Sequence, residues 1–248
     1  DPVELTRQMI DIPSVSGDEG PLADAVEAAL RDAGFGTLPS LEILRDGDAV
    51  CARTRLGLDQ RVVLAGHLDT VPIADNVPGR FEERDGATVL WGRGSVDMLG
   101  GCAAALALAR EVGGAIRGGD ETALSVDVTW IFYDHEEVAS HLNGLGRVQR
   151  NHPEWLAGDL ALLGEPTAAH VEGGCNGTLR VIAHFPGRAA HSARAWMGIN
   201  AIHAMAPVIE RIAAFGNPVV TVDGLEFRES LSVVRVAGGI ANNVIPEA

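Results

Sequence analysis

The segment RVVLAGHLDTVP, residues 61–72, joins a short apolar run to a polar turn. The run from Arg61 to Gly66 is aliphatic and bounded by polar residues, which predicts a buried strand. On an extended backbone, side chains two residues apart face the same way, so His67 and Asp69 should project together beyond the end of this strand. Open α/β sheets place their functional sites at that edge. The alternative is that both are ordinary turn residues.

Strands and helices alternate on both sides of this segment. Apolar periodicity predicts helices over residues 2–10, 20–33 and 100–112, and strands over residues 50–55, 61–66, 89–91, 124–133 and 160–164. The helix predicted at 100–112 is rich in alanine and leucine, which is typical of a helix packed closely against a sheet. This alternation predicts an α/β layered sheet.

The pattern changes after Gly173, where we expect a second, α+β module. Its predicted elements are a strand over 178–185, a helix over 199–215 and strands near residues 219 and 232. The glycine-rich stretch at 172–174 is the expected boundary, which gives domains at 1–173 and 174–248. The few strands predicted for this second module are fewer than a stable sheet usually has.

The composition excludes several classes of protein. A chain of 248 residues with 46% hydrophobic residues can bury a substantial core. Its 34 acidic and 19 basic residues give a net charge of −15, so nucleic acid and anionic membranes are not expected partners. No apolar stretch approaches the roughly 18 residues of a membrane span and no signal sequence opens the chain, which predicts a cytoplasmic protein. The scattered cysteines indicate neither a disulfide framework nor a thiolate zinc site.

Acidic residues follow other predicted strands and turns. The turn GRGSVDMLGG, residues 92–101, leaves Asp97 at the entrance of the alanine-rich helix, where it could equally be an N-cap. The strand ending at Tyr133 runs into Asp-His-Glu-Glu, and on extended backbone Glu136 and Glu137 would point to opposite sides. One glutamate could then bind a metal while the other faces water, or the run could be a solvated loop.

A fourth carboxylate, Glu165, follows the strand predicted at 160–164. Taken together, the histidine, aspartate and glutamate residues form a nitrogen and oxygen ligand set without thiolate, which suits a catalytic zinc or a similar divalent ion. The carboxylate-rich set favours two metal ions that activate a water and polarise a carbonyl.

Several segments in order along the chain resemble the zinc-dependent aminoacylase and carboxypeptidase G-like family. They are HLDTVP (67–72), GRGSVDMLGG (92–101), DHEEV (134–138), GEPT (164–167), AHSARAWMGINA (190–201) and NNVIP (242–246). The resemblance implies a three-layer, zinc-peptidase-like α/β catalytic domain with a smaller α+β lid and dimerisation domain.

The resemblance also implies a set of metal ligands. His67 would bind one of two Zn²⁺ ions, or Co²⁺ or Mn²⁺ in their place, and Glu165 would bind the same ion. Asp97 would bridge both ions, Glu137 would bind the second, and Asp69 would hold the His67 ring.

Catalytic and substrate residues follow from the same resemblance. Glu136 would be the general base that takes a proton from water and delivers it to the leaving amine. His191 would reach across a homodimer to the substrate carbonyl. Asn242 would contact substrate, and Arg180 and Arg194 are cationic candidates for the substrate carboxylate.

Within the family, residues 172–181 and the run from 190 look most like the succinyl-diaminopimelate desuccinylases. This implies a small N-acyl amino acid substrate, N-succinyl-LL-2,6-diaminopimelate, cleaved to succinate and diaminopimelate for lysine and peptidoglycan precursors. The alternatives are an N-acetyl-amino-acid deacetylase, an aminoacylase or a carboxypeptidase with the same metal centre, or a non-catalytic remnant that dimerises through residues 174–248. An intact Glu136 argues against the remnant.

The sequence departs from the family pattern in three ways. Leu99 stands where members usually have lysine, and Asn176 stands where some desuccinylases have an arginine for the substrate carboxylate. The family's last metal-binding histidine, from a C-terminal segment, has no counterpart. We therefore expect these 248 residues to be an incomplete portion of a longer enzyme.

Overall fold

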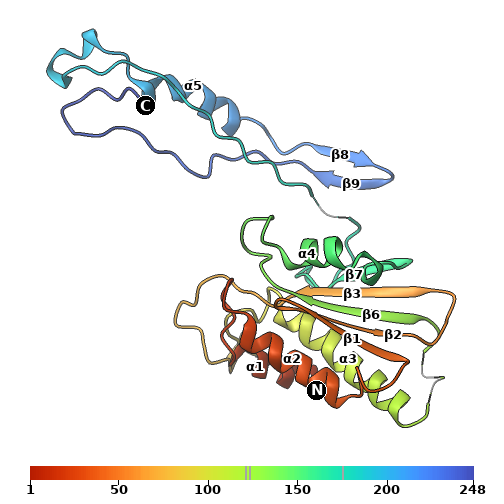
Figure 1. The fold of residues 1–248 in the computed structure, drawn as a ribbon. Coiled ribbons are helices and arrows are strands. Elements are labelled where there is room, and N and C mark those ends of the chain that lie inside the picture. Colours follow the sequence, from red (N-terminus) through yellow and green to blue (C-terminus); the bar gives the residue numbers. More distant parts are fainter. Residues whose placement is uncertain (121, 123, 175) are drawn as a thin grey trace. The chain divides into compact units, whose positions relative to one another are not determined.

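The computed structural model describes residues 1–120, 122, 124–174 and 176–248 (Figure 1). Their contacts divide the chain into two compact units, Asp1–Ala169 and His170–Ala248. The boundary expected from the sequence, between residues 173 and 174, lies a few residues further along the chain.

Within the described residues, the first unit contains a five-stranded mixed sheet with the order β1-β2-β6-β3-β7. The strands are β1 (Leu41–Asp46), β2 (Ala49–Thr54), β3 (Arg61–His67), β6 (Asp127–Tyr133) and β7 (Leu160–Leu163). The pairs β1–β2 and β2–β6 are antiparallel, whereas β3 pairs in parallel with both β6 and β7. The carboxyl ends of β6, β3 and β7 therefore lie side by side at one edge of the sheet.

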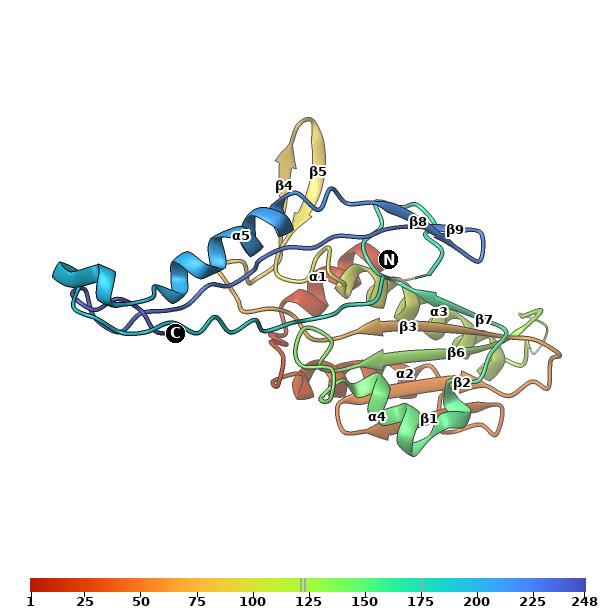
Figure 2. The same cartoon turned by 90° about the horizontal axis from the view of Figure 1, so that it is seen from above.

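Helices cover both faces of this sheet, as Figures 1 and 2 show. The helices are α1 (Pro2–Ile10), α2 (Gly20–Asp32) and α3 (Leu99–Arg117) on one face, and α4 (Gly144–Asn151) on the other. Because side chains alternate along a strand, Trp130 and Phe132 of β6 join the core with α1, α2 and α3, whereas Ile131 and Tyr133 join the core with α4. The predicted three-layer α/β arrangement is confirmed.

Apolar residues on α3 explain its central position. Its buried positions, including Cys102, Leu106 and Ala109, recur at helical spacing and pack in the main core. By length and composition alone α3 could cross a membrane, but its buried stripe contacts the sheet in the way expected of a core helix.

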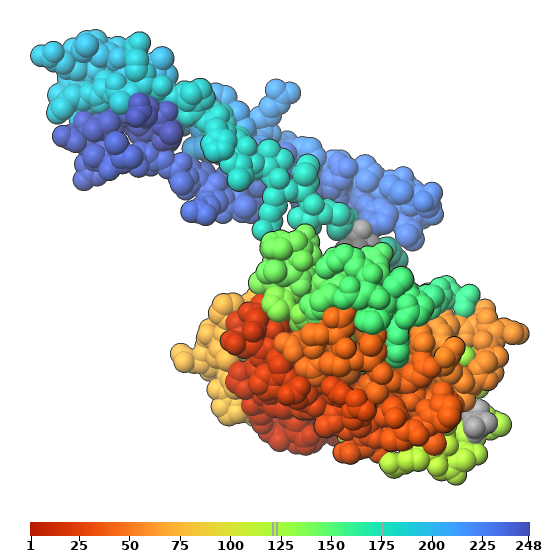
Figure 3. All heavy atoms as spheres, viewed as in Figure 1, coloured from red at the N-terminus to blue at the C-terminus, as the bar shows by residue number. Residues whose placement is uncertain are grey.

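At the surface, α4 and the short 3-10 helix η1 (Pro153–Trp155) lie beside β1 and β2 (Figure 3). Arg147 of α4 donates from Nη2 to the Asp46 carbonyl at 2.7 Å. Arg53 of β2 stacks its guanidinium over the Trp155 ring, 4.1 Å from the centroid. These contacts fix the segment that follows β6 against the antiparallel half of the sheet.

A separate hairpin, β4 (Arg80–Arg84) and β5 (Ala87–Trp91), belongs to the same unit and stands out in Figure 2. Its turn residues Asp85 and Gly86 both have positive φ, 51° and 79°. A two-residue turn of this kind matches the twist of the paired strands, which explains the tight connection.

The second unit contains η2 (Ser192–Met197), α5 (Ala201–Ala213) and a hairpin of β8 (Val219–Val222) with β9 (Leu225–Arg228). Helix α5 begins after Asn200, whose Oδ1 accepts hydrogen bonds from the backbone N–H groups of Ile202 and His203.

The structure corrects several sequence-based predictions. The strands predicted over 178–185 and near residue 232 are wrong: within the described residues, both segments lie outside any strand. Their apolar residues had suggested strands, but a strand needs a hydrogen-bonded neighbour, and Val181 and Ile182 are exposed. The elements β1, β4, α4 and β9 were not predicted.

Candidate metal centre

Parallel pairing places three of the predicted polar segments at one edge of the sheet. His67 is the last residue of β3 and pairs with Tyr133, the last residue of β6. The acid loop, defined as residues 134–137, follows directly, and Glu165 lies just beyond the end of β7. Their proximity follows from strand order, because β3 lies between β6 and β7.

Close packing of α3 brings Asp97 to the same edge. A Cβ atom on Gly101 would collide with the carbonyl oxygen of Gly164, and one on Gly66 would lie 2.7 Å from Met98 Cε and 2.8 Å from Cys102 Sγ. Glycine is therefore required where α3 meets the ends of β3 and β7. Helix α3 begins at Leu99 after Met98, so Asp97 precedes the helix and is not its N-cap.

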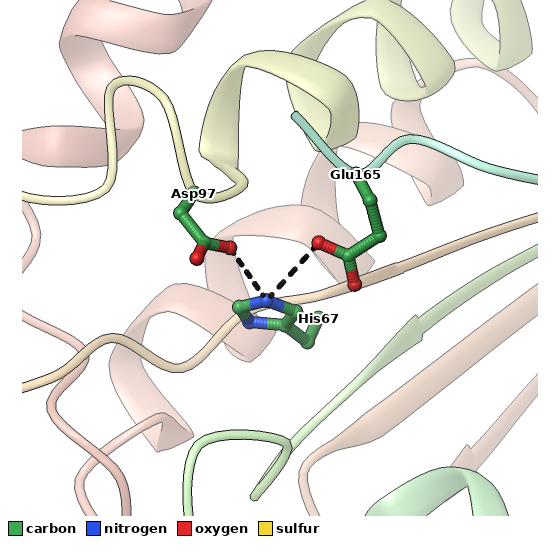
Figure 4. A group of neighbouring side chains, drawn as sticks. All are labelled: His67, Asp97 and Glu165. Atoms are coloured by element: carbon green, nitrogen blue, oxygen red, sulfur yellow. Dashed lines mark hydrogen bonds and ion pairs between the residues drawn. The ribbon is translucent and has the colours of Figure 1, made fainter. Parts of the chain in front are cut away.

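Figure 4 shows His67, Asp97 and Glu165 facing one another. His67 Nε2 lies 3.1 Å from Asp97 Oδ1 and 4.0 Å from Glu165 Oε2, and one ligand atom from each residue lies within 4.8 Å of the others. Bonds of about 2 Å to a tetrahedral ion place neighbouring ligand atoms roughly 3.3 Å apart. The nitrogen and oxygen donors therefore fit a divalent metal ion after small side-chain shifts.

The second nitrogen of His67 fixes which atom faces the carboxylates. Nδ1 lies 2.9 Å from the Asp69 backbone carbonyl, which can only accept a hydrogen bond, so Nδ1 carries the proton in the neutral ring. Nε2 then presents its lone pair toward Asp97 and Glu165. The Asp69 carboxylate lies further from Nδ1, at 3.5 Å, so the backbone carbonyl makes the shorter contact.

The Asp69 carboxylate instead connects the His67 strand to the acid loop. It accepts hydrogen bonds from Glu136 N at 2.8 Å, Glu137 N at 3.0 Å and Ser16 Oγ at 2.7 Å. Burial alone would raise the pKa of Asp69, but His67 and these donors lower it to about 2. Asp69 is therefore an anion that holds both segments.

The acid loop is bent, which corrects the expectation of extended backbone at Glu136 and Glu137. His135 has a positive φ of 59°, and the next two N–H groups converge on the single Asp69 carboxylate. Glu136 is exposed and Glu137 half-buried, and Glu137 lines the same surface hollow as Asp97.

Negative charge accumulates at this edge of the sheet. Burial raises the pKa of Glu137, and the neighbouring Asp97 carboxylate raises it further. Burial also raises the pKa of Glu165; His67 opposes this effect and Asp97 adds to it. Carboxylates that resist ionisation because other carboxylates are close favour a bound cation.

The remaining predicted residues belong to the second unit. His191 precedes η2, and its Nδ1 accepts from Ala193 N at 3.1 Å. Arg194 N donates to the His191 carbonyl at 2.8 Å, and a β-bridge between His191 and Val244 brings the segment of Asn242 alongside. Arg180 lies instead on a segment, residues 176–184, whose residues are all exposed. All four residues lie in the second unit, His170–Ala248.

Sequence reasoning missed two residues that contact this centre. Ser16 donates a hydrogen bond to the Asp69 carboxylate, and Glu19 accepts one from the backbone N–H of His135. Both lie in a polar loop before α2. The loop carries no motif that distinguishes it from an ordinary helix entrance, so no sequence signal could have identified them.

Comparisons with known proteins identify relatives over the whole chain. The chain is 50% identical over 248 residues to a Mycobacterium tuberculosis protein named "putative succinyl-diaminopimelate desuccinylase" and 49% identical over 247 residues to a succinyl-diaminopimelate desuccinylase of Corynebacterium glutamicum. It spans 65% and 63% of the lengths of these relatives.

Solved structures support the fold. A tripeptidase from Staphylococcus aureus matches 99% of this chain and 63% of its own length, with a TM-score of 0.66 and 16% identity. The Bacillus subtilis YXEP protein, described as a dinuclear metal-binding peptidase, matches 99% of this chain and 60% of its own length, with a TM-score of 0.54 and 17% identity.

The sequence also matches the model of a protein family. Residues 63–227 match Peptidase family M20/M25/M40 and include His67 at the end of β3, the acid loop and Glu165. Because this match covers more than half of the 248 residues, the chain belongs to Peptidase family M20/M25/M40.

Proposed function

We propose that this chain is part of a metal-dependent amidohydrolase that cleaves N-succinyl-LL-2,6-diaminopimelate to succinate and LL-2,6-diaminopimelate. The observation that carries the substrate assignment is the 49% identity over 247 residues to the succinyl-diaminopimelate desuccinylase of Corynebacterium glutamicum. The chemistry is supported by the cluster of His67, Asp97 and Glu165 beside the acid loop.

Two Zn²⁺ ions are the proposed cofactors, and Co²⁺ or Mn²⁺ would suit the same donors. His67 and Glu165 would hold the first ion, Asp97 would bridge, and Glu137 would hold the second. The support for this is the 4.8 Å cluster and the hollow that Asp97 and Glu137 share. When bound, the ions polarise the substrate carbonyl and lower the pKa of water.

Glu136 of the acid loop performs both proton transfers of the hydrolysis. Glu136 takes a proton from the attacking water and delivers it to the leaving amine, which requires a carboxylate within hydrogen-bond reach of both. Its backbone N–H is fixed on Asp69 while its side chain stays exposed, so the carboxylate is anchored at its base and open to substrate. Asp69 also contacts the His67 ring.

Residues of the second unit would complete the substrate site in a homodimer. His191 would donate a hydrogen bond to the oxyanion from across the dimer. Asn242 would contact the substrate, and Arg194 and Arg180 would pair with its carboxylates. Exposure of these side chains supports the assignment, because none of them is committed to a core. The reaction would take place in the cytoplasm.

The test measures succinate and amine release from N-succinyl-LL-2,6-diaminopimelate by the complete natural protein with added Zn²⁺. We expect release that stops with a chelator. Glu136→Gln should keep its metal content and lose activity, whereas Glu154→Gln, on η1 and away from the centre, should keep both. Acetate release from an N-acetyl amino acid instead would reassign the protein as a deacylase, and no release from either substrate would refute the proposed reaction.

A further inference from the structure

Glu19 is a fully buried carboxylate to which the proposed reaction gives no role. It is 0% exposed and occupies the N-cap position of α2, but its side chain makes no capping hydrogen bond to that helix. A buried charge is costly unless it is paired and hydrogen-bonded. Its partners therefore indicate what the burial achieves.

The Glu19 carboxylate bonds to the acid loop. Oε1 accepts from His135 N at 3.2 Å and lies 3.3 Å from His135 Nδ1, and Oε2 accepts from Gly17 N at 2.9 Å. The residues joined, 19 and 135, are far apart in sequence. Glu19 thus ties the loop before α2 to the loop after β6.

His135 is the residue at which the acid loop turns. It has φ of 59°, a conformation that non-glycine residues seldom adopt without support. Its ring Nδ1 also lies 2.7 Å from Asp134 Oδ2, and Arg147 Nη2 donates a hydrogen bond to Asp134 Oδ1 at 2.6 Å. The turn is therefore held through both its backbone and its side chain.

Three consecutive backbone N–H groups of the acid loop donate hydrogen bonds to two buried carboxylates. His135 donates to Glu19, and Glu136 and Glu137 donate to Asp69. Ser16, from the same loop as Glu19, donates to Asp69 at 2.7 Å. The segment before α2 therefore supports the acid loop at both of its anchors.

We propose that Glu19 is a positioning residue that, through His135, fixes the direction in which the acid loop presents Glu136 and Glu137. This inference rests on the proposed function, because it matters for catalysis only if these glutamates act as base and metal ligand. Glu19 touches neither substrate nor metal. Its effect is on the geometry of the loop.

Asp127 provides a matched control. It is also a buried carboxylate of the first unit, 3% exposed, and it accepts from Thr54 Oγ1 and from the N–H groups of Leu56 and Leu58. It lies at the opposite end of β6 from the acid loop. Removing it should destabilise the fold without disturbing the loop.

The experiment compares Glu19→Ala and Asp127→Ala by hydrogen exchange and by kinetics. In metal-free protein, exchange of the amides at 134–137 should be about tenfold faster in Glu19→Ala and unchanged in Asp127→Ala. In the complete natural protein, Glu19→Ala should lower kcat about 10-fold to 100-fold with KM little changed, because a small misplacement of a catalytic group has effects of that order. Asp127→Ala should lower the unfolding temperature but not kcat.

Glu19→Gln keeps the volume and one acceptor oxygen, so it should restore part of the exchange protection and part of kcat. It also serves as the test variant if Glu19→Ala does not fold. Unchanged exchange at 134–137 in both Glu19 variants, or equal changes in Asp127→Ala, would overturn the inference. Because exchange is read without substrate, failure of the proposed reaction in the parent protein is recognised separately, as absent succinate release.

Discussion

Without bound metal, the stability of the first unit should depend on the protonation of His67. The imidazole is 1% exposed. Burial opposes its protonation, but the hydrogen bond and charge of Asp69, together with the charge of Glu165, outweigh burial and raise its pKa from 6.5 to about 9. The folded chain therefore binds a proton at this site more tightly than the unfolded chain does.

The direction and size of the effect follow from this difference. Because the folded pKa is the higher one, the stabilisation is fully present below pH 6.5 and is lost as the pH rises through about 9. A rise from 6.5 to about 9 corresponds to about 3 kcal/mol. The contact between His67 and Asp69 also lowers the pKa of Asp69, so the stabilisation from the two pKa shifts is counted once.

Urea unfolding of the chelator-treated protein between pH 6 and 10 measures this effect. The free energy of unfolding of the parent should fall by about 3 kcal/mol relative to His67→Gln across this range. Saturating Zn²⁺ should reverse the trend, because metal binds neutral imidazole and gains affinity as the proton leaves. Parallel profiles of parent and variant, or a fall completed below pH 7, would refute the reasoning.

Three further predictions concern metal, packing and the core. Adding Zn²⁺ to the chelator-treated chain should raise its unfolding temperature, and the rise should continue with the logarithm of the Zn²⁺ concentration above Kd while the circular dichroism spectrum stays unchanged; a metal-independent unfolding temperature would contradict the site. Gly101→Ala should destabilise the chain by about 1–3 kcal/mol and weaken metal binding, because the new methyl group meets the Gly164 carbonyl. Gly114→Ala on the same helix meets nothing within 4 Å and should be neutral or stabilising; equal denaturation midpoints for the two variants would contradict the packing argument. Phe35→Ala should cost about 3–5 kcal/mol in the same denaturation assay, because Phe35 is fully buried and packs edge-on against Trp130, and a loss under about 1 kcal/mol would contradict that packing.

The layered sheet could be predicted because its signals are local. The apolar runs of β3 and β6 and the alanine-rich α3 each carry a pattern that identifies the element without knowledge of its neighbours. The failures at 178–185 and near residue 232 have the opposite cause. An apolar, β-branched segment becomes a strand only when another strand pairs with it, and the residues of the segment do not show whether such a partner exists.

The sequence predicts which residues lie at the site only as far as it predicts where the strands end. Knowing where β3, β6 and β7 end places His67, the acid loop and Glu165 at one edge once the strands are parallel. The contacts of Asp69 were not predictable, because they depend on the bend at His135 and on Ser16 from a distant loop. Side-chain spacing of two residues indicated a shared direction, but it did not identify the backbone carbonyl as the closer partner of His67.

Gathering carboxylates at one edge of the sheet is unfavourable for the metal-free fold. Burial and the charge of Asp97 raise the pKa of both Glu137 and Glu165, so ionising either glutamate is less favourable in the folded chain than in water. A sequence selected for stability alone would separate these residues, since the net charge of −15 already favours expansion. A divalent cation reverses the sign of the interaction, because each carboxylate that destabilised the metal-free site then becomes a ligand or a neighbouring counter-charge. Metal binding is therefore the simplest explanation for the close approach of these carboxylates. If so, metal affinity and folding stability should be coupled, and a variant that binds the metal less tightly should gain less stability from it.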